Sequence, residues 1–229
     1  MLKMKKALGL VALFAPFALF SQQDSTKVKK PKTHHSIGIG IKAGFSFSNI
    51  TNASQVNASS RTGYHFGLLL GTSSKSILGS RTEFLYSRRG YNYAASATDN
   101  GSIDLDYIQL AQLLAINITK YVQIQIGAET SYLLSAKADS SLPSTGNASA
   151  DKAINYYNRF DYGYGGGIEI HPIAGLLIGA RYNISLANLY KTPTSYTVGS
   201  SGQPPSFVPS TSSINLKNNV VQLFVGYRF

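Results

Sequence analysis

Eight segments of the chain alternate apolar and polar residues with the period of two that is typical of β-strands. In the first, residues 37–48, isoleucine, alanine and phenylalanine fall on one face, and glycine, lysine and serine on the other. The last, residues 219–229, ends on an aromatic carboxyl-terminal residue, Phe229. The other six centre on residues 64–71, 81–87, 108–118, 122–132, 160–170 and 176–186. This patterning predicts an all-β protein.

Short and long connections alternate between these segments. The short ones lie around residues 73–76, 119–120 and 171–172. The long ones, rich in Ser, Thr, Asn, Gly and Pro, span residues 49–62, 94–102, 140–159 and 191–217. Each segment is close to the ~9–11 residues that a tilted membrane-spanning strand needs. We therefore predict an eight-stranded antiparallel up-and-down transmembrane β-barrel with short periplasmic turns and long outer loops.

The alternative is a soluble β-barrel or sandwich, which would show the same alternation. The predicted apolar faces carry few charges, and the opposite faces are too polar and glycine-rich for a conventional packed core. Tyrosines also cluster near the predicted strand ends, as in the aromatic girdles of membrane proteins. They are Tyr86, Tyr107, Tyr132, Tyr182, Tyr190 and Tyr227. These features favour the membrane barrel.

The first residues of the chain predict export. Lys3, Lys5 and Lys6 precede an apolar run over residues 7–20, which Ser21 ends. Such a run is too short to span a membrane comfortably and is typical of a secretory signal peptide. We predict a signal peptide over residues 1–21, a basic periplasmic tail over 22–36 and an outer-membrane barrel domain over 37–229. A retained N-terminal anchor helix is the alternative.

Charge and cysteine content narrow the functional classes. The formal net charge of +11 falls to about +8 without the three lysines of the predicted signal. A basic chain suggests nucleic acid as a partner, but four lysines, at positions 27, 29, 30 and 32, lie in the predicted tail and the other cations are scattered. We expect no nucleic-acid partner. The chain has no cysteine, which excludes disulfides and a lipoprotein attachment thiol.

Six motifs, in order along the chain, resemble those of the PorT-like outer-membrane β-barrel family. They lie at residues 39–50, 83–87, 132–137, 160–163 with 165–169, 181–183 and 223–229. The resemblance implies an eight-stranded barrel in the outer membrane. In similar proteins an ending such as Tyr227-Arg228-Phe229 is a signal for the barrel-insertion machinery, which is therefore an expected partner, besides outer-membrane lipid. One family member is associated with a secretion system, and that role is not carried over to this chain.

Alternation also predicts which charges point into the barrel. The cations are Lys42, Arg81, Arg181 and Arg228, and the acids are Glu83, Glu129, Asp161 and Glu169. A lumen this narrow holds its own side chains or a small ligand, and buried charges are costly unless they pair. We predict a filled interior held by ion pairs and glutamines rather than an open pore. A proton or substrate relay is the alternative role for these charges.

Residues that could support catalysis or metal binding are few. His65 is expected at the outer end of the second strand, where it could serve as a catalytic base or as a hydrogen-bonding residue of the lumen or rim. His34 and His35 lie in the predicted tail, and His171 in a predicted periplasmic turn. We find no triad spacing and no metal-ligand spacing outside the tail, and we expect no cofactor and no metal.

These observations predict a non-enzymatic outer-membrane barrel with both termini in the periplasm. Its role is structural, that of an accessory to a secretion or assembly machine, or that of an adhesin. The longest predicted loop, residues 191–217, carries four prolines and exposed aromatics and could contact a protein partner. An outer-membrane enzyme acting on lipid or peptide is the alternative.

Overall fold

A computed structural model describes residues 37–51, 58–72, 77–94, 100–138, 153–191, 208 and 215–229. The predicted signal peptide, the predicted tail with His34 and His35, and most of the 191–217 loop lie outside these residues. Among the described residues, no helix is long and apolar enough to cross a membrane.

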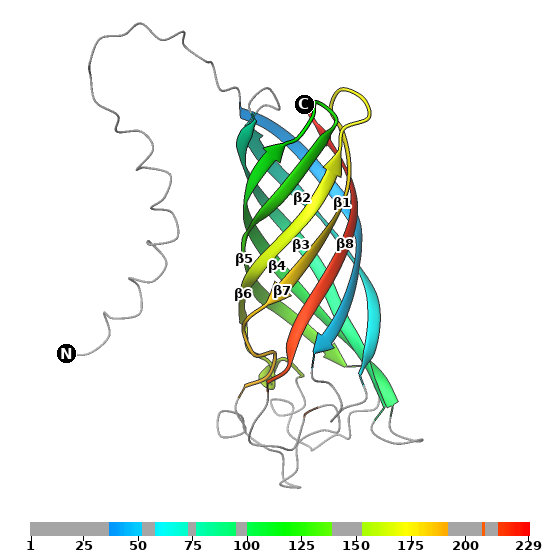
Figure 1. Ribbon diagram of the computed structural model, residues 1–229. Coiled ribbons are helices and arrows are strands. Elements are labelled where there is room, and N and C mark those ends of the chain that lie inside the picture. Colours follow the sequence, from blue (N-terminus) through cyan, green and yellow to red (C-terminus); the bar gives the residue numbers. More distant parts are fainter. Residues whose placement is uncertain are drawn as a thin grey trace, which may run out of the picture. The chain divides into compact units, whose positions relative to one another are not determined.

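Eight antiparallel strands form one closed barrel, which confirms the predicted fold (Figure 1). Each strand pairs with its neighbours in the sequence, and the last pairs with the first from Gly40 opposite Arg228 to Thr51 opposite Lys217. The strands are β1 (Ile37–Thr51), β2 (Ser59–Thr72), β3 (Leu78–Ala94), β4 (Asn100–Asn117), β5 (Val122–Ala138), β6 (Phe160–Ile170), β7 (Leu176–Ser185) and β8 (Lys217–Arg228). A short 3₁₀ helix, η4 (Ala153–Asn155), precedes β6.

The first five strands are longer than predicted. They have 14 to 18 residues, whereas β6, β7 and β8 have 10 to 12. The predicted long loops over residues 49–62 and 94–102 are therefore wrong in extent, because β1 continues to Thr51 and β4 begins at Asn100. In the extended parts of β3 and β4 the outer face turns polar, with Arg88, Asn92 and Asp104, while the inner face stays apolar. The outward apolar pattern used to bound the strands therefore stops, although the backbone pairing continues.

The two ends of the barrel differ, and we name them by their connections. The loop end carries the β1–β2, β3–β4, β5–β6 and β7–β8 connections, and the turn end carries the other three together with Phe229. In the β6–β7 turn, Gly175 has a φ of 85°, a left-handed conformation that favours glycine. Its carbonyl accepts a hydrogen bond from the Arg228 N–H at 2.7 Å, so this turn also ties down the end of β8.

The outer wall is covered by an apolar belt, which we define as the exposed apolar side chains of the eight strands. Ile39, Ile41, Val221, Val225 and Phe229 belong to it, with 39 to 77% of their surface exposed, and the predicted outward face is confirmed. Tyr132, Tyr182 and Tyr227 also face outward, whereas Tyr107 and Tyr190 are buried. The girdle prediction is therefore wrong for these last two tyrosines.

Where the pairing of β2 with β3 is irregular, the Ser48 side chain of β1 hydrogen-bonds the backbone of β3. The register between β2 and β3 shifts between Ser60 and His65. There the Ser48 hydroxyl donates to the Gly90 carbonyl at 2.7 Å and accepts from the Gly90 N–H at 2.8 Å. Buried backbone groups need such partners, so the Ser48 hydroxyl satisfies the Gly90 N–H and carbonyl where the ladder is interrupted.

The interior has two layers of different chemistry. Near the turn end and the middle it holds buried charged and glutamine side chains, as predicted, with the apolar side chains of Leu69, Leu85, Leu113, Leu177 and Phe224 among them. Near the loop end it is a hydrophobic core of 14 buried residues among those that the structure describes, six of them tyrosines: Tyr91, Tyr93, Tyr107, Tyr156, Tyr157 and Tyr190. The expectation that the inner faces are too polar for a packed core is therefore wrong at this end.

Candidate functional site

Glu83 on β3 lies at the centre of the polar layer. Its carboxylate accepts hydrogen bonds from Arg181 on β7, at 2.7 Å to Oε2 and 2.9 Å to Oε1. It also accepts one from Lys42 Nζ on β1, at 2.9 Å. All three side chains are buried, and Arg181 and Glu83 are 98 positions apart in the sequence. The contacts therefore cross the lumen and join three separate parts of the wall.

Gln125 on β5 extends this network toward the turn end. Its amide oxygen accepts from Arg181 at 2.5 Å, and its amide nitrogen donates to Glu169 on β6 at 2.9 Å. Glu169 also accepts from Arg81 at 2.5 Å and pairs with His171 at 2.7 Å. His171 follows β6 as predicted, but its ring is buried and closes the polar layer rather than facing solvent. We call these seven connected residues the ion-pair plate.

A second polar group lies between the ion-pair plate and the hydrophobic core. Arg89 on β3 donates to Gln109 at 2.6 Å and lies 3.5 Å from Asp161 and 4.0 Å from Glu129. Gln109 in turn donates to Glu129 at 2.7 Å. The Arg89 guanidinium also lies 5.1 Å from the centre of the Tyr107 ring, a cation–π contact that links the polar and apolar layers.

Seven of the eight predicted interior charges fall into these two groups. Lys42, Arg81, Glu83, Glu169 and Arg181 belong to the ion-pair plate, and Glu129 and Asp161 to the group around Arg89. Arg228 lies half-buried at the turn end, with its side chain over Gly38. Arg89 was missed, although the inward alternation of residues 81, 83, 85 and 87 reaches it once β3 is extended. The two groups therefore hold four cations, with Arg89 as the fourth, and four carboxylates, while Arg228 faces inward beside them at the turn end.

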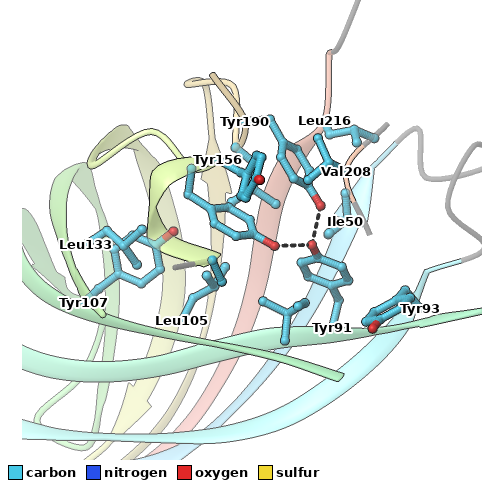
Figure 2. Packing of buried hydrophobic residues seen from close by; sticks show 14 residues of the cluster. Ile50, Tyr91, Tyr93, Leu105, Tyr107, Leu133, Tyr156, Tyr190, Val208 and Leu216 are labelled. Carbon is cyan, nitrogen blue, oxygen red and sulfur yellow. Dashed lines mark hydrogen bonds between the residues drawn. The ribbon is translucent and has the colours of Figure 1, made fainter. Parts of the chain in front are cut away.

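The hydrophobic core closes the loop end with residues from the connections themselves (Figure 2). The Tyr91 hydroxyl bonds the hydroxyl of Tyr157, at 2.5 Å, and that of Tyr190. The rings of Tyr157 and Tyr190 stack with centroids 4.9 Å apart, and the two residues form an isolated β-bridge. Burial raises the pKa of both phenols, so they stay neutral and remain hydrogen-bond partners.

Further apolar residues from separate parts of the chain complete this core. Val208 and Leu216 from the β7–β8 connection and Ala153 from η4 pack with strand residues such as Leu105 and Leu133. The two longest connections are also tied together by the backbone. The Lys191 N–H donates to the Tyr156 carbonyl at 3.0 Å, and the Asn158 N–H donates to the Leu189 carbonyl at 2.9 Å. The described parts of these connections therefore form a packed closure over the mouth.

His65 lies inside the barrel rather than at its outer end. It is 1% exposed, pairs in register with Gly44, and its Nδ1 lies 3.0 Å from the Ser46 hydroxyl. Six residues of β2 separate it from the loop end of that strand, because β2 begins at Ser59. The predicted position at the outer end of the strand is therefore wrong, whereas the contact with Ser46 agrees with the predicted role of a hydrogen-bonding residue in the lumen. Within the described part of the chain, no group of three His, Cys, Asp or Glu residues could hold a metal ion.

Comparison with known proteins gives a family match and several structural likenesses. A family model described as outer membrane protein beta-barrel domain matches residues 20–191. No curated protein matches the chain. Similar solved structures include Ail, the attachment invasion locus protein of Yersinia pestis, with 15% identity, a TM-score of 0.43, and 84% of this chain and 98% of that chain covered. OprG from Pseudomonas aeruginosa shows 12% identity and a TM-score of 0.45, with 86% of this chain and 97% of that chain covered. Neisserial surface protein A shows 15% identity and a TM-score of 0.45, with 84% of this chain and 97% of that chain covered.

The ion-pair plate predicts a large effect of a single neutral substitution. Glu83→Gln keeps the side-chain shape but leaves the buried charges of Arg181 and Lys42 without their counter-charge. We expect the free energy of unfolding to fall by about 3–5 kcal/mol, measured by urea titration of the protein folded in lipid vesicles. Glu129→Gln is the control, because Glu129 accepts from a neutral glutamine and lies 4.0 Å from Arg89, and it should cost about 1–2 kcal/mol. Equal losses would contradict the central role of Glu83.

Proposed function

The chain belongs to the outer membrane protein beta-barrel domain family, and from this premise we propose that it is a closed, non-enzymatic barrel that presents its longest connections to a protein partner at the cell surface. The observation that carries the proposal is the double closure of the lumen. The ion-pair plate crosses the barrel, and the hydrophobic core at the loop end incorporates residues of the connections. A barrel built to conduct would keep an open, polar path.

Two features of the site support a role other than catalysis. His65, the only histidine that sequence reasoning singled out as a candidate base, is buried against Ser46 and away from both ends of the barrel. A general base has to come within hydrogen-bonding distance of its substrate. The carboxylates of the lumen are engaged by arginine and lysine, as expected of structural pairs.

We assign the turn end to the periplasm and the loop end to the cell surface. Short turns on the periplasmic side and longer outer loops are the rule for outer-membrane barrels. This barrel has short connections at the turn end and its two longest connections at the loop end. In this orientation the chain terminus at Phe229 is periplasmic. Tyr227 and Phe229 are 45% and 77% exposed, with ring centroids 5.4 Å apart, so both rings are accessible to the barrel-insertion machinery.

The packed closure supports a platform rather than a set of free loops. Residues 153–159 and 186–191 are tied to each other and to β3 by the tyrosine hydroxyls and by backbone hydrogen bonds. Ordering these segments in advance lowers the entropic cost of binding a partner. Such a platform suits an accessory of a secretion or surface-assembly machine, or an adhesin.

Conductance measurements test the closure. We expect the protein in a planar lipid bilayer to show no steady nanosiemens-scale conductance, because two layers of side chains fill the lumen. A combined Glu83→Ala and Tyr157→Ala variant removes one central member of each layer and serves as the opened reference. A steady open channel in the unsubstituted protein would overturn the proposal of a closed barrel.

Single cysteines test the orientation, since the chain has none of its own. Lys137 is exposed at the loop end of β5, and Lys120 is exposed in the β4–β5 connection at the turn end. In intact cells, a membrane-impermeant maleimide should label the Lys137→Cys variant and spare the Lys120→Cys variant, with both labelled after lysis. The reverse pattern would show the opposite orientation.

A photo-crosslinker at the loop end tests for a protein partner. Asn188 is exposed there and its carbonyl accepts from Asn158, while Ile173 at the turn end is 65% exposed and serves as the control position. In intact cells we expect a crosslinked protein from position 188 that position 173 does not capture. Its identity separates a secretion component from a host or surface ligand. Absence of any adduct at position 188 would leave a purely structural barrel and contradict the platform.

A further inference from the structure

A groove of about 530 Å³ lies in the outer wall over β8, β1 and β2. Its outward-facing lining is apolar: Ile41, Ala43, Phe66, Leu68, Val225 and Tyr227, with Leu176 at its edge. Its volume is within the ~300–1,000 Å³ of small-molecule sites. The ion-pair plate and the hydrophobic core do not use this surface, because it lies on the opposite side of the wall.

The strand register explains why the wall is hollow at this point. Ala43 on β1 is flanked in register by Phe66 on β2 and Val225 on β8. In the next outward row toward the turn end, Ile41 lies between Leu68 and Tyr227, and toward the loop end Phe45 lies between Tyr64 and Leu223. The side chain of Ala43 is thus a single methyl group surrounded by larger side chains. The space that these neighbours leave above it forms a notch in the groove.

The floor of the groove is backbone without any outward polar side chain. Between the Ala43 and Ile41 rows, Lys42 pairs in register with Gly67 and Gly226. The Lys42 ammonium points inward to Glu83, and a Cβ on Gly67 would come 2.1 Å from the Phe84 carbonyl oxygen. Apart from the Tyr227 hydroxyl, the outward side chains of the groove offer only dispersion contacts, so the part of a ligand that lies in it must be apolar.

We propose that this groove holds one acyl chain of a phospholipid as a specific, long-lived lipid contact. It is continuous with the apolar belt, which faces the hydrocarbon of the membrane in this family of proteins. It extends from the Ala43 row, in the middle of the apolar stretch of β1, toward Tyr227 and Leu176 at the turn end. With the orientation proposed above, on which this assignment rests, the turn end faces the periplasmic leaflet, whose lipids are phospholipids.

The shape of the groove favours an acyl chain over a second barrel. Two barrels meet along a narrow line, because both walls are convex. A notch one side chain deep is filled better by a thin, flexible chain, which gains contacts with Phe66, Ile41 and Val225 that a void would lose. The occupant that we assign is therefore a phospholipid acyl chain.

Filling the notch tests this assignment. Protein in detergent micelles is mixed with palmitoyl-oleoyl phosphatidylethanolamine, and the lipid that remains bound is counted by native mass spectrometry. We expect Ala43→Leu to lower the bound fraction about fivefold or more. Ala128→Leu is the matched control, since Ala128 is also exposed in the belt but lies on β5 between Gln112 and Tyr164, and it should retain the lipid. A gel-mobility assay for the folded barrel, repeated on Ala43→Ile, separates lost binding from lost folding.

The other outcomes overturn the proposal in distinguishable ways. Equal lipid retention in all three proteins would show that the groove holds no specific lipid. A dimer that Ala43→Leu abolishes would assign the groove to a second copy. Displacement of the phospholipid by lipid A would contradict the assigned lipid class. The cysteine labelling and the conductance are measured independently, so a failure of the proposed orientation or closure is not confused with a failure of the lipid site.

Discussion

A charge that points into the lumen of this barrel has to find an opposite charge within the same lumen. Eight strands enclose little more than their own side chains, and an unpaired buried charge is far more costly than a paired one. Arg181 and Lys42 meet this requirement through Glu83, and Arg81 through Glu169. These contacts join β1, β3, β6 and β7 across the interior, so the wall and its contents are stabilised together.

The apolar layer at the loop end follows from the unequal strand lengths. β3, β4 and β5 have 17 or 18 residues and β6, β7 and β8 have 10 to 12. The inner faces of the longer strands carry Tyr91, Ile103 and Leu105, which would be exposed to water without a cover. The two longest connections provide it through Tyr157, Tyr190 and their neighbours. The same contacts that cover the lumen also fix the described parts of these connections, and this supports the proposed platform.

The outer wall obeys a different rule, because the membrane removes most of the hydrophobic driving force between apolar surfaces. Contacts there depend on shape, and the notch over Ala43 differs from the rest of the belt in shape rather than in chemistry. Three consecutive residues of β1 contribute to both sides of the wall. Lys42 is fixed inward by Glu83, while its neighbours Ile41 and Ala43 line the groove outside. The proposed lipid contact and the ion-pair plate therefore lie back to back.

The amino-acid sequence by itself determined the strand number, the antiparallel order, and the face on which Lys42, Glu83 and Arg181 lie, because side chains alternate strictly along a strand. It could not determine where β3 ends, so Arg89 was missed, and it placed Tyr107 and Tyr190 on the outer girdle although both are buried. Only the tertiary structure decided which charges meet. Arg181 and Glu83 come together because closure of the barrel brings β7 opposite β3, and the notch over Ala43 exists because the register places Phe66 and Val225 beside it. Register and closure depend on the whole ring of strands, and no local pattern encodes them.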